Sequence, residues 1–115
     1  MYANAQRMKW ETLQSIAFGS ISGTYATLGS ALPNPSRLIR IVNTTNADIL
    51  ISTDGTTNND IVPAGGFVLY DIMSNRSDSA GVFVLDQGAR LYVKQASGAP
   101  TSGSVYLVSI YASSF

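Results

Sequence analysis

Few side chains in this sequence could carry enzymatic chemistry. It has seven acidic and seven basic residues but no histidine and no cysteine. Histidine is the usual general base and the commonest transition-metal ligand, and a cysteine thiolate is a common nucleophile. Without them, two possibilities stay open: a serine paired with Lys9 or Lys94, or two carboxylates acting on a glycosidic bond.

The acidic residues stand mostly in sequences typical of turns. They neighbour Gly, Asn or Ser, as in Asp54-Gly55 and Ser77-Asp78, where a short carboxylate accepts hydrogen bonds from the nearby backbone. Turn formation therefore explains these residues better than catalysis. We expect a protein that is not an enzyme and that has no cofactor, no metal and no small-molecule substrate.

Two binding alternatives remain open. Segment 54–60 (DGTTNND) is rich in the oxygen ligands that calcium prefers, although its spacing differs from the EF-hand pattern and no glutamate closes the loop. Tyr92 and Tyr106 could stack on a sugar ring, although aromatic residues in strands more often pack within the fold.

Charge is scarce and balanced. Charged residues make up 12% of the chain with a net charge of zero, against about 25% charged residues in typical domains. The basic residues are scattered singly, without the positive stripe that neutralises nucleic-acid phosphates. No apolar run approaches the roughly 18 residues of a membrane helix. We expect neither nucleic acid nor membrane among the partners, and a surface partly hidden by other proteins.

Short β-type runs separated by turn sequences fill the chain from residue 15 onward. Asp54-Gly55 is a hairpin signal, and residues 63–66 (PAGG) are turn-like. No helical pattern intervenes, which argues against parallel βαβ units. The pattern predicts one antiparallel, jelly-roll-like β-sandwich domain over residues 15–115, with about seven to nine strands. The expected strands are 15–19, 24–28, 37–43, 48–53, 67–72, 82–85, 90–95 and 104–112.

Three of these strands are apolar on both faces. In segment 37–43 (RLIRIVN), Ile39 and Ile41 share one face and Leu38 and Val42 the other. Strands covered on only one side normally alternate apolar and polar residues. A second copy of the chain is the natural cover, unless the strands close into a barrel or a bulge reverses their faces. We expect a homo-oligomer with these outer-face contacts: Leu38, Val68, Tyr70, Tyr106, Val108 and Ile110.

Residues 1–14 (MYANAQRMKWETLQ) differ from the rest. They lack Gly and Pro, and their large apolar side chains do not form a helical stripe. We expect an extended or partly helical N-terminal arm. Because tryptophan is costly to leave in water, the arm should pack on a neighbouring subunit or on its own sandwich. Its expected anchors are Tyr2, Met8 and Trp10.

Several segments form a recognisable series. Residues 40–55 (RIVNTTNADILISTDG), 58–65 (NNDIVPAG) and 67–71 (FVLYD) are followed by 91–94 (LYVK) and 103–107 (GSVYL). The series resembles the small β-sandwich virion proteins of tailed bacteriophages, in which a strand ending in a D-G turn is followed by a P-A-G turn and another strand. The resemblance spans residues 37–111.

The resemblance implies a non-catalytic structural protein of the virion, at the head–tail connector or neck or on the capsid surface. Such a protein contacts copies of itself and other virion structural proteins. Other bacterial sandwich domains share the same turns, so the alternative is a carbohydrate-binding β-sandwich module. An exposed aromatic platform beside the loops would favour the module, and subunit contacts through Ile39, Val68 and Ile110 would favour the virion protein.

Overall fold

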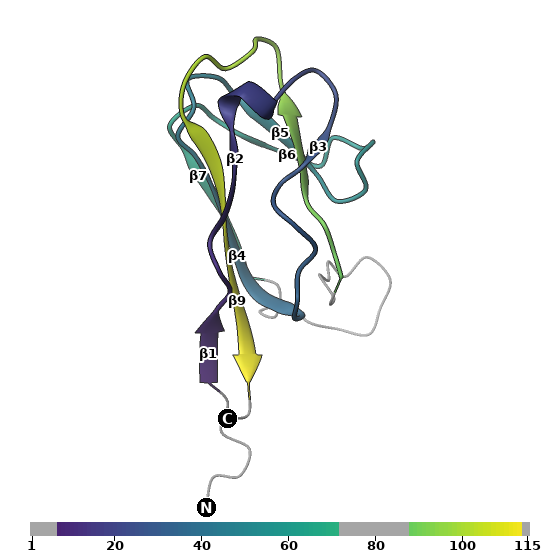
Figure 1. Ribbon diagram of the computed structural model, residues 1–115, viewed down its shortest axis with the longest axis vertical. Coiled ribbons are helices and arrows are strands. Elements are labelled where there is room, and N and C mark those ends of the chain that lie inside the picture. The colour runs from purple at the N-terminus through teal and green to yellow at the C-terminus, as the bar shows by residue number, and fades with distance from the viewer. Residues whose placement is uncertain (1–6, 72–87, 114–115) are drawn as a thin grey trace, which may run out of the picture.

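The computed structural model describes residues 7–71 and 88–113, which form two antiparallel β-sheets packed against each other (Figure 1). Sheet A has the order β1-β9-β4-β7, with β2 also paired to β9; sheet B has the order β3-β8-β5-β6. The prediction of an all-β antiparallel sandwich is confirmed. The strands of sheet A are β1 (Arg7–Trp10), β2 (Gln14–Ala17), β4 (Ser36–Asn43), β7 (Phe67–Asp71) and β9 (Ser104–Ser113). Those of sheet B are β3 (Ala26–Thr27), β5 (Ile49–Ser52), β6 (Asp60–Val62) and β8 (Tyr92–Gln95).

Several boundaries differ from the sequence-based expectation. The first expected strand stops at Ala17 because a 3₁₀ turn, η1 (Phe18–Ser20), follows it. β6 was expected to be loop and turn, yet three residues just before Pro63 pair with β5. The strand expected at 82–85 lies outside the described residues.

The described part of the expected arm, residues 7–14, is extended and lies along β9. Trp10 is opposite Ile110 and Gln14 is opposite Leu107, so three residues of the arm face two of β9. This extra residue is a β-bulge, which separates β1 from β2. β1 and the end of β9 form a ribbon that projects from the sandwich (Figure 1). β4 pairs with the other side of β9 as far as Tyr111, so only the pairs Arg7–Ser113 and Met8–Ala112 are two-stranded.

The core lies between the sheets and follows the period-two alternation of the strands. On β4, Ile39 and Ile41 are fully buried, while Leu38 and Val42 are only half-buried. Each fully buried aliphatic side chain stabilises the fold by about 1.5–3 kcal/mol. The other fully buried strand residues include Ile49, Ile51, Val62, Val93, Val105 and Leu107.

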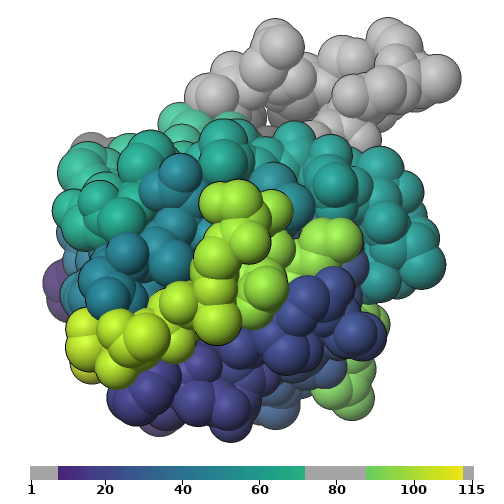
Figure 2. Space-filling view, turned by 90° about the horizontal axis from the view of Figure 1, so that it is seen from above, coloured from purple at the N-terminus to yellow at the C-terminus, as the bar shows by residue number. Residues whose placement is uncertain are grey.

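Segment 96–103 lies across one end of the sandwich, between the β4–β5 loop and the N-terminal part of the chain (Figure 2). Asn46 holds it through two hydrogen bonds with Thr101, of 2.7 and 2.8 Å. Gly103 has φ +85°, and a Cβ atom there would collide with the Thr44 carbonyl oxygen. A glycine is therefore required for this close approach.

Asn43 fixes the β4–β5 loop from within the protein. Its side chain is fully buried, and its Nδ2 lies 2.8 Å from the Ala47 carbonyl oxygen and 3.0 Å from that of Val62. Its Oδ1 accepts hydrogen bonds from the backbone N–H of Thr45 at 2.9 Å and from its hydroxyl at 2.6 Å. One amide thus satisfies backbone groups of the loop and of β6, as a buried polar group must.

Candidate interaction surface

The outward side of sheet A carries several large apolar side chains that are exposed. On β4 and β9, the residues that alternate with the core residues point away from sheet B, and pairing with β7 and β1 extends this face on both sides. We call it the sheet A face. Its large apolar members are Met8, Trp10, Leu38, Val42, Phe67, Leu69, Tyr106, Val108 and Ile110.

Several of these side chains are exposed to an extent that is unusual for their type. Trp10 is 75% exposed, Phe67 61% and Leu69 59%. A groove of about 160 Å³ lies among them, lined by Trp10, Leu38, Arg40, Leu69, Val108 and Ile110. Contiguous apolar patches rimmed by polar residues mark interaction sites on soluble proteins.

Four of the six residues expected on the outer faces do lie on the sheet A face: Leu38, Tyr106, Val108 and Ile110. Val68 and Tyr70 do not, and this placement was wrong. Val68 is opposite Ile41 and Tyr70 is opposite Ile39, so both side chains point inward and pack against the core. Their chain neighbours Phe67 and Leu69 take the outer positions, and sequence reasoning missed them.

Two of the three expected arm residues join the same surface. Met8 pairs with Ala112 and Trp10 with Ile110, which places both side chains on the sheet A face. Tyr2 lies outside the described residues. Ile39, a suggested subunit contact, is fully buried in the core of its own chain.

Sheet B differs because the chain's own loops cover part of its outer side. The Lys94 ammonium lies 4.8 Å from the centre of the Tyr25 ring, in a cation–π contact. The Tyr25 hydroxyl donates a 2.6 Å hydrogen bond to Asn58 of the β5–β6 loop. Gly55 of that loop lies against the ring of Tyr92. The two residues considered for sugar stacking lie on different sheets, Tyr92 on β8 of sheet B and Tyr106 on β9 of sheet A, and both are half-buried.

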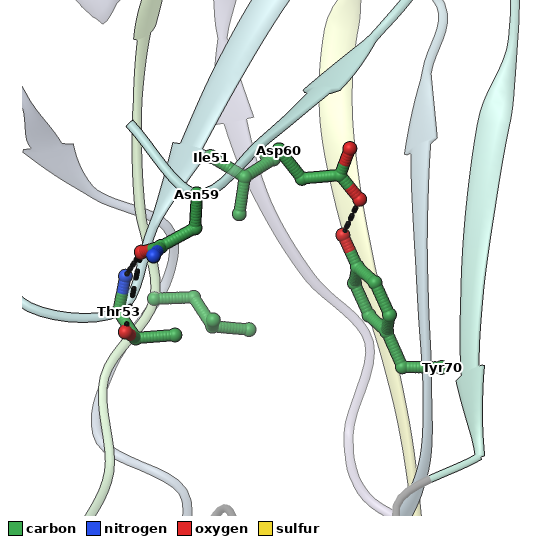
Figure 3. Close-up of a pocket in the computed structure, with 6 residues that line it drawn as sticks. Ile51, Thr53, Asn59, Asp60 and Tyr70 are labelled. Atoms are coloured by element: carbon green, nitrogen blue, oxygen red, sulfur yellow. Dashed lines mark hydrogen bonds between the residues drawn. The ribbon is translucent and has the colours of Figure 1, made fainter. Parts of the chain in front are cut away.

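A second hollow of about 220 Å³ lies at the side of the sandwich where β6 and β7 form the sheet edges (Figure 3). Ile51 and Leu91 contribute apolar surface, and Thr53, Asn59, Asp60 and Tyr70 contribute polar groups. The Tyr70 hydroxyl donates a hydrogen bond to Asp60. Burial of Tyr70, and then its contact with the Asp60 carboxylate, raise the pKa of Tyr70 well above its usual 10.0. Tyr70 is therefore a neutral donor at physiological pH.

The oxygen-rich loop at 54–60 uses its first carboxylate internally. Asp54 accepts hydrogen bonds from the backbone N–H groups of Thr56 and Thr57, both at 2.8 Å, and from the Thr57 hydroxyl. These donors, the backbone ones first, lower the pKa of Asp54 far below its usual value. Within residues 7–71 and 88–113, no group of three or more His, Cys, Asp or Glu side chains could hold a metal ion.

No family model matches the chain, and no curated protein is significantly similar to it. Among the described residues, no helix is long and apolar enough to cross a membrane.

Proposed function

We propose that this protein is a non-catalytic structural component of a tailed-phage virion. In this proposal it assembles as a symmetric oligomer at the head–tail connector or neck, or on the capsid surface, where it contacts other virion structural proteins. The observation that carries the proposal is the sheet A face, with four large side chains more than half exposed: Met8, Trp10, Phe67 and Leu69.

The composition of this face supports burial against protein. The fully buried centres of protein interfaces are depleted in charge and enriched in aromatic residues and arginine. The sheet A face has Trp10, Phe67 and Tyr106 among aliphatic residues, and Arg40 is its central charged group. The low total charge of the chain, 12% of residues, agrees with a surface that is largely hidden in an assembly.

The mass of the purified protein in solution tests this proposal. We expect light scattering on a sizing column to give a multiple of the 12.2 kDa chain mass. A double variant, Trp10→Ala with Leu69→Ala, should shift the mass toward the monomer. Ile61→Ala is the matched control, because Ile61 is an exposed aliphatic residue on sheet B. A wild-type protein that stays at 12.2 kDa at high concentration would contradict self-assembly.

A carbohydrate-binding module is the second candidate, and the hollow beside Tyr70 favours it. Small-molecule sites combine apolar walls with a few polar groups, and this hollow joins Ile51 and Leu91 to Asn59 and Asp60. Titration of the protein with common monosaccharides, followed by NMR, tests it. Saturable shifts confined to residues of the hollow would support this candidate, and their absence at tens of millimolar sugar would reject it.

A further inference from the structure

Arg40 occupies the centre of the sheet A face. Its cross-strand neighbours are Leu69 on β7 and Val108 on β9. Leu38 and Val42 flank it on the same face of β4. The side chain is exposed, and no residue that the structure describes forms a hydrogen bond or ion pair with it.

A partner that covers this face must therefore supply a negatively charged group for the unpaired guanidinium. An apolar cover would strip water from the guanidinium, and an unpaired buried charge costs several kcal/mol. An isologous contact centred on the groove would bring two Arg40 side chains together, with like-charge repulsion. The complementary surface is instead a heterologous one that presents a carboxylate, which an arginine can bind in a bidentate manner.

The carboxylates of the described residues differ in how far they are already used. Asp71, opposite Leu38 on the sheet A face itself, already has an interaction partner. Both oxygens of Asp54 accept hydrogen bonds in its own turn. Both oxygens of Asp60 are also engaged, by the Ile61 N–H and by Tyr70. Glu11 is half-buried and bonded to Asn34.

The side chain of Asp48 differs, because one of its two carboxylate oxygens is available to a partner. It is exposed at the end of the β4–β5 loop. Among the described residues, only its Oδ1 is hydrogen-bonded, by the Ala64 N–H at 2.9 Å. Its neighbour in space, Ala64, is small and also exposed, so no large side chain of Ala64 shields the carboxylate. An exposed loop end with one carboxylate oxygen free complements a groove with one unpaired guanidinium in charge.

We propose that the sheet A face of one copy binds the β4–β5 loop of the next copy, with Arg40 and Asp48 as the polar pair at the centre of the contact. This inference rests on the proposed function, since it names the contact through which the oligomer forms. A head-to-tail contact generates a ring if its rotation closes, and an open filament if it does not. The pair therefore defines a direction of assembly as well as a surface.

Charge reversal tests the pair by light scattering, with circular dichroism to confirm folding. We expect Arg40→Glu and Asp48→Arg each to raise the association midpoint at least tenfold, and the double variant to restore most of the wild-type mass. The inference would be overturned if both single variants associated like the wild type, or if the double variant did not recover association. In either case the proposed function would stand as long as the wild type is multimeric. A monomeric wild type would contradict both.

Arg40→Leu separates this contact from an isologous one. Removing the cation should weaken head-to-tail association, because Asp48 of the next copy loses its partner. It would strengthen association if two sheet A faces met each other, because a repulsion would be removed. Tighter association of Arg40→Leu would therefore overturn the inference.

Discussion

The hydroxyl of Tyr70 on β7 donates a hydrogen bond to the carboxylate of Asp60 on β6 (Figure 3). β7 is the edge strand of sheet A and β6 the edge strand of sheet B. This contact therefore ties the two sheets together along one side of the sandwich. The Tyr70 ring also packs against the core, so the tie and the hydrophobic core stabilise each other.

Tyr70→Phe should keep the ring contact and remove the tie. Loss of a hydrogen bond to a charged acceptor costs about 1.5–3 kcal/mol, which urea unfolding at neutral pH would measure. Asp60→Asn is the companion variant, because an amide keeps the shape of the side chain and its oxygen can still accept a hydrogen bond from the Tyr70 hydroxyl. We expect it to lose less stability than Tyr70→Phe. Equal stability of Tyr70→Phe and wild type would contradict a structural role for the tie.

The same tyrosine predicts a loss of stability in alkali. The folded-state pKa of Tyr70 is raised above the ordinary value of 10.0. Below pH 10 both folded and unfolded chains keep this proton; above pH 10 the unfolded chain releases it first, so stability falls as pH rises toward the folded-state pKa. Urea unfolding at pH 8 to 11 should show a steeper fall for wild type than for Tyr70→Phe. Parallel pH profiles would refute this assignment.

Asn43→Ala should destabilise the fold more than any surface substitution. The variant leaves the buried Val62 carbonyl group without its Nδ2 donor and removes the acceptor for the N–H and hydroxyl of Thr45. The half-buried Ala47 carbonyl loses one of its two donors and keeps the Thr45 hydroxyl. Each buried polar group left unpaired costs about 1–3 kcal/mol, so we expect a loss of at least about 3 kcal/mol. Thermal unfolding by circular dichroism provides the measurement, with Asn46→Ala, an exposed loop residue, as control. A loss no greater than that of the control would show that the loop does not depend on Asn43.

Residue alternation sorted the residues of β4 and β9 into two faces, but it did not show which face points inward, since Ile39 was expected to contact another subunit and is instead fully buried. Ile39 and Ile41 had to share a face opposite to Leu38, and the strand lengths left little freedom. Alternation could not assign the faces of β7, because Phe67 to Tyr70 is apolar on both sides. Only its register with β4 decides which set points inward, and register is a property of the tertiary fold.

The candidate interaction surface was predictable only in part for the same reason. Leu38 and Trp10 are far apart in sequence, and the pairing of β1 and β4 on opposite sides of β9 brings them to one groove. Nor does the sequence reveal that Arg40 lies between Leu69 and Val108. β6 was missed because three residues before a proline carry too little alternation to indicate a strand.

Gly103→Ala should destabilise the end of the sandwich where segment 96–103 lies. The residue has a positive φ, and an added methyl group would collide with backbone atoms of Thr44, which cannot move as a flexible side chain would. We expect a loss of about 2 kcal/mol or more from the combined conformational and steric cost. Gly98→Ala is the matched control in the same segment, since no atom lies within 4 Å of its added Cβ. Equal melting temperatures for the two variants would contradict the close approach.

Calcium should not stabilise this protein. Asp54 already accepts hydrogen bonds at both oxygens, and Asp60 is bonded to Tyr70, so a cation would have to displace these contacts. We expect the same melting temperature in millimolar CaCl₂ and in EDTA. A rise with calcium that disappears in Asp54→Ala would instead identify the 54–60 loop as a binding site.

Deletion of residues 1–10 should separate assembly from folding. The side chains of Met8, Lys9 and Trp10 are exposed on the projecting ribbon, and the core does not include them. We therefore expect a strand-type circular dichroism spectrum and a change in unfolding free energy below about 1 kcal/mol. Association should weaken, because the groove of the sheet A face loses the Trp10 wall. An unfolded product would instead mean that β1 is needed to hold β9 in the sandwich. A folded product that associates like the wild type would show that the arm is not part of the assembly contact. The contact would then be formed by Leu69 and its neighbours on β4 and β9.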